Sequence, residues 1–306
     1  ELPFGQRGAF RCRPIRRRRR ARVVLRTALV AVQLALPFGV APTVPQERAS
    51  VPQEARSDVL ARDGWLGLGI DEKYGGSGGG PIDIAILLEE TGRAHLDLAF
   101  WLFRNFAYGA TGIAEHGTEQ QRQAYLPGIA RGEISMAFSL TEPEAGSDAA
   151  AIITRAEPDG DDFLVTGQKW FTSGFTVADL CLVVARTDAT GRKHEGITNF
   201  LVDTKSPGIT VTPIPALGLW SLGTYGVYYD HVRVPRANVL GTIGQGWGEL
   251  RDYLEMERLC LCAARVGAST AVLEEAVAYA KERRQFGRAI GSFQGVLTDA
   301  PATELG

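Results

Sequence analysis

The feature that most limits the fold is a change in the character of the chain between about residues 133 and 240. Short runs rich in Val, Ile, Phe and Thr are separated there by Gly, Asp and Pro, as in strands joined by turns. No helix-length crossover joins these runs, so the pattern favours an antiparallel barrel or sandwich over a parallel, doubly wound sheet with its GxGxxG fingerprint. The predicted strands are Ile134–Leu140, Phe163–Trp170, Leu180–Thr187, Thr198–Asp203, Ile209–Pro213 and Val227–Val234.

Helical patterns flank this block on both sides. A helix is predicted from Pro81, where proline is permitted in the first turn, and a second helical segment from about residue 98 to 117. A third is predicted from Thr118, which has capping-box spacing to Gln121. Residues 246–286 are again helical in pattern. The sequence therefore predicts an α+β multidomain chain. It has a partial N-terminal helical domain (51–132), a middle antiparallel β-barrel or sandwich domain (133–240) and an incomplete C-terminal helical bundle (241–306).

The first fifty residues do not fit this arrangement. Residues 11–22 are dominated by arginine, and residues 23–40 are largely apolar but interrupted by polar residues and a proline. The apolar part is too short and broken for a transmembrane helix, so no stable membrane insertion is expected. Three interpretations stay open: sequence foreign to the protein, a disordered basic tail, or a targeting segment. Because the chain starts with Glu1 and not methionine, a fragment or a faulty gene model is expected.

Composition excludes several classes of function. A formal net charge of −2 provides no electrostatic argument for nucleic-acid binding. The four cysteines are scattered, which argues against a disulfide framework and favours a reducing, cytoplasmic compartment. The four histidines show neither metal-ligand spacing nor a catalytic triad pattern, so no metal site is expected.

A first candidate binding segment is Met136–Asp148, which reads MAFSLTEPEAGSD. Its apolar start predicts a strand, and Pro143 prevents ladder pairing beyond the end of that strand. Gly146 would let the backbone approach a ligand closely, while Thr141 and Ser147 provide hydroxyl groups. An ordinary turn after a strand is the alternative interpretation.

A second candidate segment is Gly167–Gly174, which reads GQKWFTSG and lies between two predicted strands. Trp170 and Phe171 offer flat apolar faces, and Thr172 and Ser173 follow with hydroxyl and amide donors. Such a combination suits a planar ring that has a polar edge. A buried aromatic pair in a β core is the alternative.

Two further charged strings occur in the last block. The string LEMERL, Leu254–Leu259, places Glu257 and Arg258 in the same predicted helical stripe as the apolar positions 250, 254 and 261. Charges in an apolar stripe are costly unless they are paired or used in chemistry. The string RRQFGRAIGSFQ, residues 283–294, contains arginines that could pair with phosphate oxygens. The alternative is an exposed helix end, where arginines lie near the negative pole of the helix dipole.

These strings, in this order, resemble the signature segments of the acyl-CoA dehydrogenase family over about residues 52–295. The resemblance implies an FAD cofactor whose flavin is held by the first and second candidate segments. It assigns ten cofactor contacts. They are Phe138, Leu140, Thr141, Gly146, Phe171, Thr172, Ser173, Arg283, Phe286 and Gln294. The last three would reach the adenosine diphosphate portion across a subunit interface.

The same resemblance assigns the substrate and the catalytic base. Ser147, Glu255 and Arg258 would contact the acyl-CoA substrate. Glu257 occupies the place of the catalytic glutamate in the isovaleryl-CoA and long-chain members. Most other members take their base from a later helix, which this chain lacks.

The activity implied is dehydrogenation of an acyl-CoA thioester to the trans-2-enoyl-CoA, as in fatty acid β-oxidation. Electrons would pass to an electron-transferring flavoprotein, and the complete protein would form a homo-oligomer, in this family usually a tetramer. Two alternatives stay open: an acyl-CoA oxidase-like flavoenzyme that uses oxygen, and a non-catalytic fragment that keeps the fold.

Overall fold

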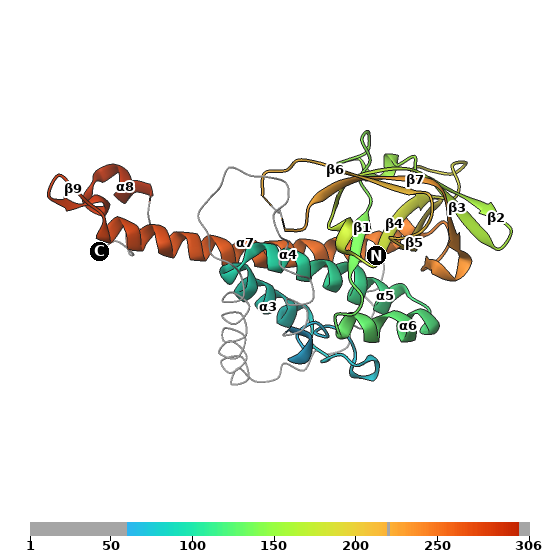
Figure 1. Ribbon diagram of the computed structural model, residues 1–306, viewed down its shortest axis with the longest axis horizontal. Coiled ribbons are helices and arrows are strands. Elements are labelled where there is room, and N and C mark those ends of the chain that lie inside the picture. The colour runs from blue at the N-terminus through green and yellow to red at the C-terminus, as the bar shows by residue number, and fades with distance from the viewer. Residues whose placement is uncertain (1–59, 219–220, 300–306) are drawn as a thin grey trace, which may run out of the picture.

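The structure is a computed structural model that describes residues 60–218 and 221–299. Helices form one layer beside a β-sheet, and one long helix continues out of this body toward the C-terminal end (Figure 1). The order of these parts confirms the predicted fold class: N-terminal helices, a middle β domain and a C-terminal helical region.

The N-terminal helices begin and end where local sequence signals predict. Pro81 occupies the first turn of α3, and the positions expected on its apolar face, Ile84, Leu87, Leu88 and Thr91, are all buried. Thr118 and Gln121 form the predicted capping box at the start of α6. The elements are η1 (Glu72–Tyr74), α3 (Pro81–Ala94), α4 (Leu96–Arg104), the π-helix η2 (Asn105–Thr111), α5 (Gly112–His116) and α6 (Glu119–Ala130).

The middle block forms one eight-stranded sheet in the order β6-β7-β3-β2-β4-β5-β8, with β1 paired to β4. The strands are β1 (Met136–Ser139), β2 (Arg155–Asp159), β3 (Asp162–Ser173), β4 (Leu180–Arg186), β5 (Ile197–Asp203), β6 (Ile209–Pro213), β7 (Thr224–Pro235) and β8 (Val239–Leu240). Short 3₁₀ turns connect them: η3 (Ala149–Ala151), η4 (Phe175–Val177) and η5 (Arg236–Asn238).

All six predicted strands are present, and most pairings are antiparallel, as expected. The exceptions are the parallel pairs β1–β4 and β2–β4. Among the described residues no pairing joins β6 to β8, so the sheet is sandwich-like and not a closed barrel.

Strand β4 is buried on both faces and separates two apolar cores. Leu180, Leu182 and Val184 belong to the core shared with the helices, whereas Cys181 and Val183 belong to the core within the β domain. This explains why β4 is continuously apolar and does not alternate with polar residues.

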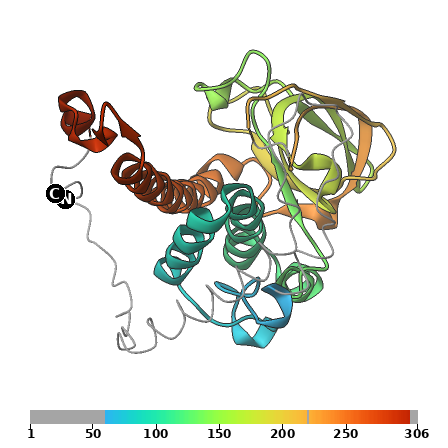
Figure 2. The same ribbon diagram turned by 60° about the vertical axis from the view of Figure 1, so that its left-hand side comes forward.

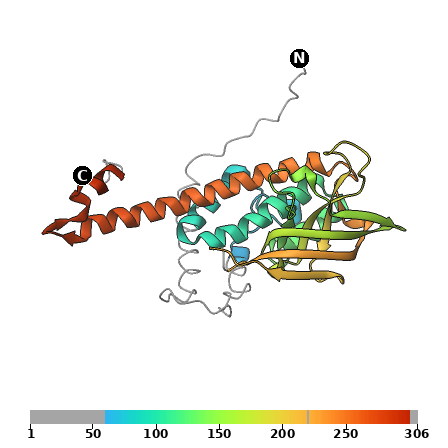
Figure 3. The ribbon, with the colours of Figure 1, turned by 90° about the horizontal axis from the view of Figure 1, so that it is seen from above.

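Helix α7 (Gly246–Glu282) has 37 residues and is about 55 Å long. Its first part lies beside α3, α4 and η2, and its last turns extend beyond them (Figures 2 and 3). The packing of α3 on α7 brings the backbones together, because a Cβ atom on Gly267 would lie only 1.8 Å from the carbonyl oxygen of Glu89. Beyond α7 follow β9 (Arg284–Gln285), β10 (Arg288–Ala289), η6 (Ile290–Ser292) and α8 (Gln294–Asp299). Across the described residues, the helices lack the combination of length and apolarity that spanning a bilayer requires.

Candidate active site

A cavity of about 350 Å³ lies where the helical layer meets the sheet. It is formed by residues from α4, η2, β1, β3 and α7 together with the loops next to β1 and β7. The lining is mainly aromatic and apolar, and its charged side chains are Arg104 and Glu257. The full set is Phe100, Phe103, Arg104, Tyr108, Phe138, Leu140, Thr141, Trp170, Phe171, Ser173, Leu222, Leu254, Glu257 and Leu261.

The π-helix η2 contributes Tyr108 to the helical wall of this cavity, beside residues of α4 and α7. A π-helical turn is rare, and it often occurs at functional sites. Here the side-chain oxygen of Asn105 accepts a hydrogen bond from the backbone N–H of Met136 at 2.9 Å, which ties η2 to β1. The same segment buries Tyr108 and stacks its ring on Phe138, with centroids 4.5 Å apart and planes inclined by 23°.

Glu257 faces the cavity from α7 and is partly buried. Burial raises the pKa of its carboxyl group above the usual value, although a hydrogen bond from the Tyr108 hydroxyl and the charge of Arg258 both act in the opposite direction. Burial and the charge of Glu257 hold the pKa of Tyr108 well above its usual value, so Tyr108 stays a hydrogen-bond donor. A carboxyl group with a raised pKa in an apolar cavity suits a general base.

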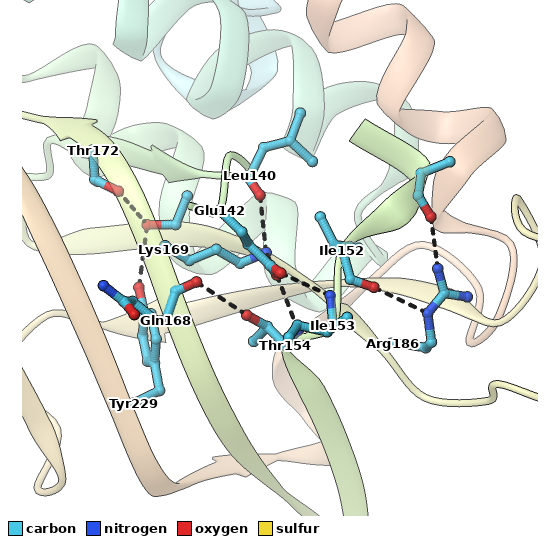
Figure 4. A network of polar contacts seen from close by, with 12 residues as sticks. Leu140, Glu142, Ile152, Ile153, Thr154, Gln168, Lys169, Thr172, Arg186 and Tyr229 are labelled. Atoms are coloured by element: carbon cyan, nitrogen blue, oxygen red, sulfur yellow. Dashed lines mark hydrogen bonds and ion pairs between the residues drawn. The ribbon is translucent and has the colours of Figure 1, made fainter. Parts of the chain in front are cut away.

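A buried ion pair joins the two candidate binding segments (Figure 4). The Lys169 ammonium, which is 0% exposed, lies 2.8 Å from a carboxylate oxygen of Glu142 and donates to the Leu140 carbonyl at 3.0 Å. Glu142 also accepts hydrogen bonds from the backbone N–H groups of Ile153 and Thr154. Lys169 lowers the pKa of Glu142 despite its burial, and burial lowers the pKa of Lys169 to about 8.

This ion pair was missed in the sequence analysis, although both residues lie in the strings that it singled out. Two signals were available in the sequence. Glu142 directly precedes Pro143 in the first string, and Lys169 lies within a predicted strand in the second. Their pairing places the end of β1 against β3, and the Trp170 backbone N–H reinforces this by donating to the Thr141 carbonyl at 2.7 Å.

Strand β3 is irregular where it borders the cavity. Its pairing with β7 shifts register between Lys169 and Thr172, and Phe171 takes a positive φ of 60°. This conformation is unfavourable for a bulky residue and often marks a functional site. As a result Phe171 is 59% exposed, lines the cavity, and meets the Trp170 ring edge to face at 6.2 Å.

The predicted flavin contacts in the two segments separate into those that line the cavity and those that do not. Phe138, Leu140, Thr141, Phe171 and Ser173 all line it.

The other two predicted contacts in these segments lie outside the lining. Thr172 is buried, and its hydroxyl lies 2.9 Å from the Ser139 hydroxyl within the sheet. Gly146 is exposed, and a Cβ atom built on it would contact no atom of the described chain within 4 Å. The roles of both residues in cofactor binding stay predictions.

The predicted substrate contacts are exposed, and none of them is among the residues that line the cavity. Ser147 is exposed in the loop after β1, and Glu255 and Arg258 are exposed on α7. The prediction that Arg258 lies within the apolar stripe of the helix is wrong. Only Glu257 of the charged pair lies at the cavity, because the two side chains point in directions about 100° apart on a helix.

The remaining predicted cofactor contacts lie beyond the far end of α7, away from the cavity (Figure 1). Arg283 and Gln294 are exposed there, and Phe286 is 93% exposed. Within one chain these three residues do not meet the cavity, so a contact across a subunit interface stays a prediction.

The lining fits a flat heteroaromatic ring. Aromatic faces come from Phe138, Trp170 and Phe171, while Thr141 and Ser173 bring hydroxyl groups to the same wall. A flavin needs this combination of apolar faces and edge donors. The described residues contain no cluster of His, Cys, Asp or Glu that could hold a metal ion.

Comparison with known proteins matches the chain to one family over three domains. Residues 39–133, 137–232 and 244–300 match the models of the N-terminal, middle and C-terminal domains of acyl-CoA dehydrogenases. The chain is 37% identical over 238 residues to the probable acyl-CoA dehydrogenase YngJ of Bacillus subtilis, which covers 76% of this chain and 62% of that protein. It is 34% identical over 252 residues to the caffeyl-CoA reductase-Etf complex subunit CarC of Acetobacterium woodii, covering 82% of this chain and 66% of that one.

A solved structure gives the same result at the level of the fold. The acyl-CoA dehydrogenase from Geobacillus kaustophilus aligns with a TM-score of 0.79 and 31% identity, over 90% of this chain and 73% of that one. The predicted FAD cofactor is in line with these matches. The chain spans less than two thirds of the length of the curated relatives named above. Its three domains match in sequence and in order, and the chain belongs to the acyl-CoA dehydrogenase family.

Proposed function

We propose that the protein catalyses FAD-dependent dehydrogenation of an acyl-CoA thioester to its trans-2-enoyl product. The observation that carries this proposal is the position of Glu257. It is a partly buried carboxyl group with a raised pKa, and it faces a cavity whose opposite wall is built from the two candidate flavin-binding segments.

The side chains divide the work between binding and proton transfer. Phe100, Phe103 and Leu261 form an apolar wall that excludes water from the acyl group. Glu257 removes the α-proton, and the Tyr108 hydroxyl orients its carboxylate by donating to it. FAD, when bound, supplies the acceptor for the β-hydrogen as hydride.

The wider setting of the reaction is also proposed. Electrons would pass to an electron-transferring flavoprotein, as suggested by the relative named as a subunit of a reductase-Etf complex. Residues beyond the far end of α7 would meet a second subunit in a homo-oligomer, usually a tetramer in this family. A role in fatty acid β-oxidation and a cytoplasmic location complete the proposal, the latter because Cys181, Cys260 and Cys262 are free thiols.

The test is an absorbance spectrum of the purified chain supplied with FAD, before and after anaerobic addition of acyl-CoA thioesters. A bound flavin that bleaches is the expected result, and Glu257→Gln should slow the bleaching by about 10²–10⁴-fold. Glu275→Gln, on an exposed part of α7, is the matched control and should bleach at the wild-type rate.

Three other outcomes would change the proposal. Oxygen consumption with acyl-CoA in place of electron transfer to a flavoprotein would favour the oxidase alternative. A bound flavin that stays oxidised with every thioester would contradict the dehydrogenase activity. Absence of flavin binding would favour the non-catalytic fragment.

A further inference from the structure

The second charged residue of the cavity, Arg104, is not used by the proposed reaction. It is the last residue of α4 and is only 2% exposed. One terminal nitrogen, Nη1, donates to the carbonyl oxygens of Ser173 and Gly174, both at 3.2 Å. Its Nε and Nη2 atoms are buried and have no hydrogen-bond partner among the described residues.

The two unpaired nitrogens lie on one edge of the guanidinium group. This Nε–Nη2 edge carries two parallel N–H groups and is the edge that binds a carboxylate side-on with two hydrogen bonds. The two carbonyls fix the opposite corner of the group, so its orientation is set before any ligand binds. Gly174, at a φ of 66°, makes room for this arrangement, because a Cβ atom there would lie 2.3 Å from Nη1.

The charge of Arg104 is also unpaired within residues 60–218 and 221–299, where no carboxylate forms an ion pair with it. The nearby ionisable groups are the Tyr108 hydroxyl and the Cys181 thiol, which are neutral at physiological pH. Burial lowers the pKa of Arg104 to about 10, so the group stays cationic at neutral pH. A buried cation without an anion is costly, and a ligand that supplies the anion would remove this cost.

We propose that the acyl group of the substrate carries a carboxylate, which pairs with the free edge of Arg104. The favoured substrates are then CoA monothioesters of short dicarboxylic acids. This inference rests on the proposed function, and it names the substrate class of the same cavity. Because the flavin ring would share this cavity, only part of its volume of about 350 Å³ is left for the acyl group, which favours a short one. Phe100 and Phe103 offer apolar contacts to the carbon chain of such a group. Since both nitrogens are covered in the present arrangement, binding requires side chains of the cavity wall to shift.

The test compares three matched pairs of thioesters that differ only in their terminal group. Succinyl-CoA is compared with butyryl-CoA, glutaryl-CoA with pentanoyl-CoA, and adipyl-CoA with hexanoyl-CoA. Dissociation constants are measured by calorimetry on the FAD-supplied full chain carrying Glu257→Gln, which prevents turnover. At least one diacid is expected to bind about tenfold or more tightly than its methyl-ended partner, as for a buried charge-assisted pair.

Variants of the arginine then assign the preference. Arg104→Met should abolish it, and Arg104→Lys, which keeps the charge but loses the fork, should retain only part of it. The control is Arg265→Met: the Arg265 guanidinium lies 5.0 Å from the centroid of Phe100 but is exposed on α7. It should leave the preference unchanged. If Arg104→Met does not fold, as judged by circular dichroism, Arg104→Lys carries the comparison.

The outcomes separate this inference from the proposed function. Bleaching of the wild-type flavin by methyl-ended thioesters, with no diacid preference in binding, would overturn the inference and leave the dehydrogenase intact. A diacid preference that survives Arg104→Met would also overturn it. Failure of every thioester to bind would overturn both.

Discussion

Two cations are buried in the described part of the protein, Arg104 in the lining of the cavity and Lys169 in strand β3 outside that lining, and their surroundings differ. Lys169 on β3 is paired with Glu142 and donates to a carbonyl, so its charge and its donors are used within the protein. Arg104 on α4 has two carbonyl partners and two unpaired nitrogens. The first cation joins two segments of the fold, whereas the second keeps binding capacity for a ligand. Burial is therefore common to both cations, and what distinguishes them is whether their nitrogen atoms have hydrogen-bond partners within the described protein.

The largest effect is expected where the paired cation loses its anion. Glu142→Gln leaves the Lys169 charge buried and unpaired, and should lower the free energy of unfolding by about 3–5 kcal/mol in urea denaturation. The double variant Glu142→Gln/Lys169→Met removes both charges and should recover part of this loss. If Glu142→Gln lowered the free energy of unfolding by less than about 1 kcal/mol, Lys169 would not depend on its anion, and the contrast with Arg104 would be wrong.

A second prediction concerns the carboxyl group that Tyr108 supports. The hydrogen bond from Tyr108 lowers the pKa of Glu257, so Tyr108→Phe should raise that pKa further. Because the base must be ionised, the rate of anaerobic flavin bleaching should rise with pH through this pKa, and the rise should move to higher pH in the variant. Tyr279→Phe, at an exposed site on α7, is the control. An unchanged pH profile in Tyr108→Phe would contradict the assigned hydrogen bond.

The raised pKa of Glu257 also has a consequence for stability. The folded state holds the proton more tightly than the unfolded chain. This stabilisation is present below the unfolded pKa and is lost as pH rises through the folded pKa. The free energy of unfolding should therefore fall over that window in the wild type, and the fall should be absent in Glu257→Gln. Equal pH dependence in both proteins would show that the carboxyl group is not shifted.

The smallest effect on stability is expected at the unpaired cation. Arg104→Met loses two hydrogen bonds to carbonyls but also removes a buried cation that has no anion, so the two effects oppose each other. The free energy of unfolding should change by no more than about 1 kcal/mol. A loss as large as that of Glu142→Gln would mean that Arg104 is a structural cation as well.

Local patterns predicted many of the elements, and the exceptions have identifiable causes. Strand β2 was missed because only Ala156 of its five residues is buried and Pro158 interrupts it. It is a strand because it pairs with β3 across a tight turn from Asp159 to Asp162. The π-helix η2 was also missed, since a widened turn depends on packing between helices and on the Asn105 contact with β1.

The sequence by itself determined the local elements: the capping box of α6, the proline start of α3, the strand runs and the two segments that line the cavity. These depend on contacts between near neighbours in the chain, which composition and spacing express directly. Only the tertiary structure decided that Glu257, and not Arg258, faces the cavity, that Lys169 meets Glu142, and that Arg104 keeps one edge unpaired. Those outcomes depend on how distant segments pack, because burial and partners are set by packing between elements and not by neighbours in sequence.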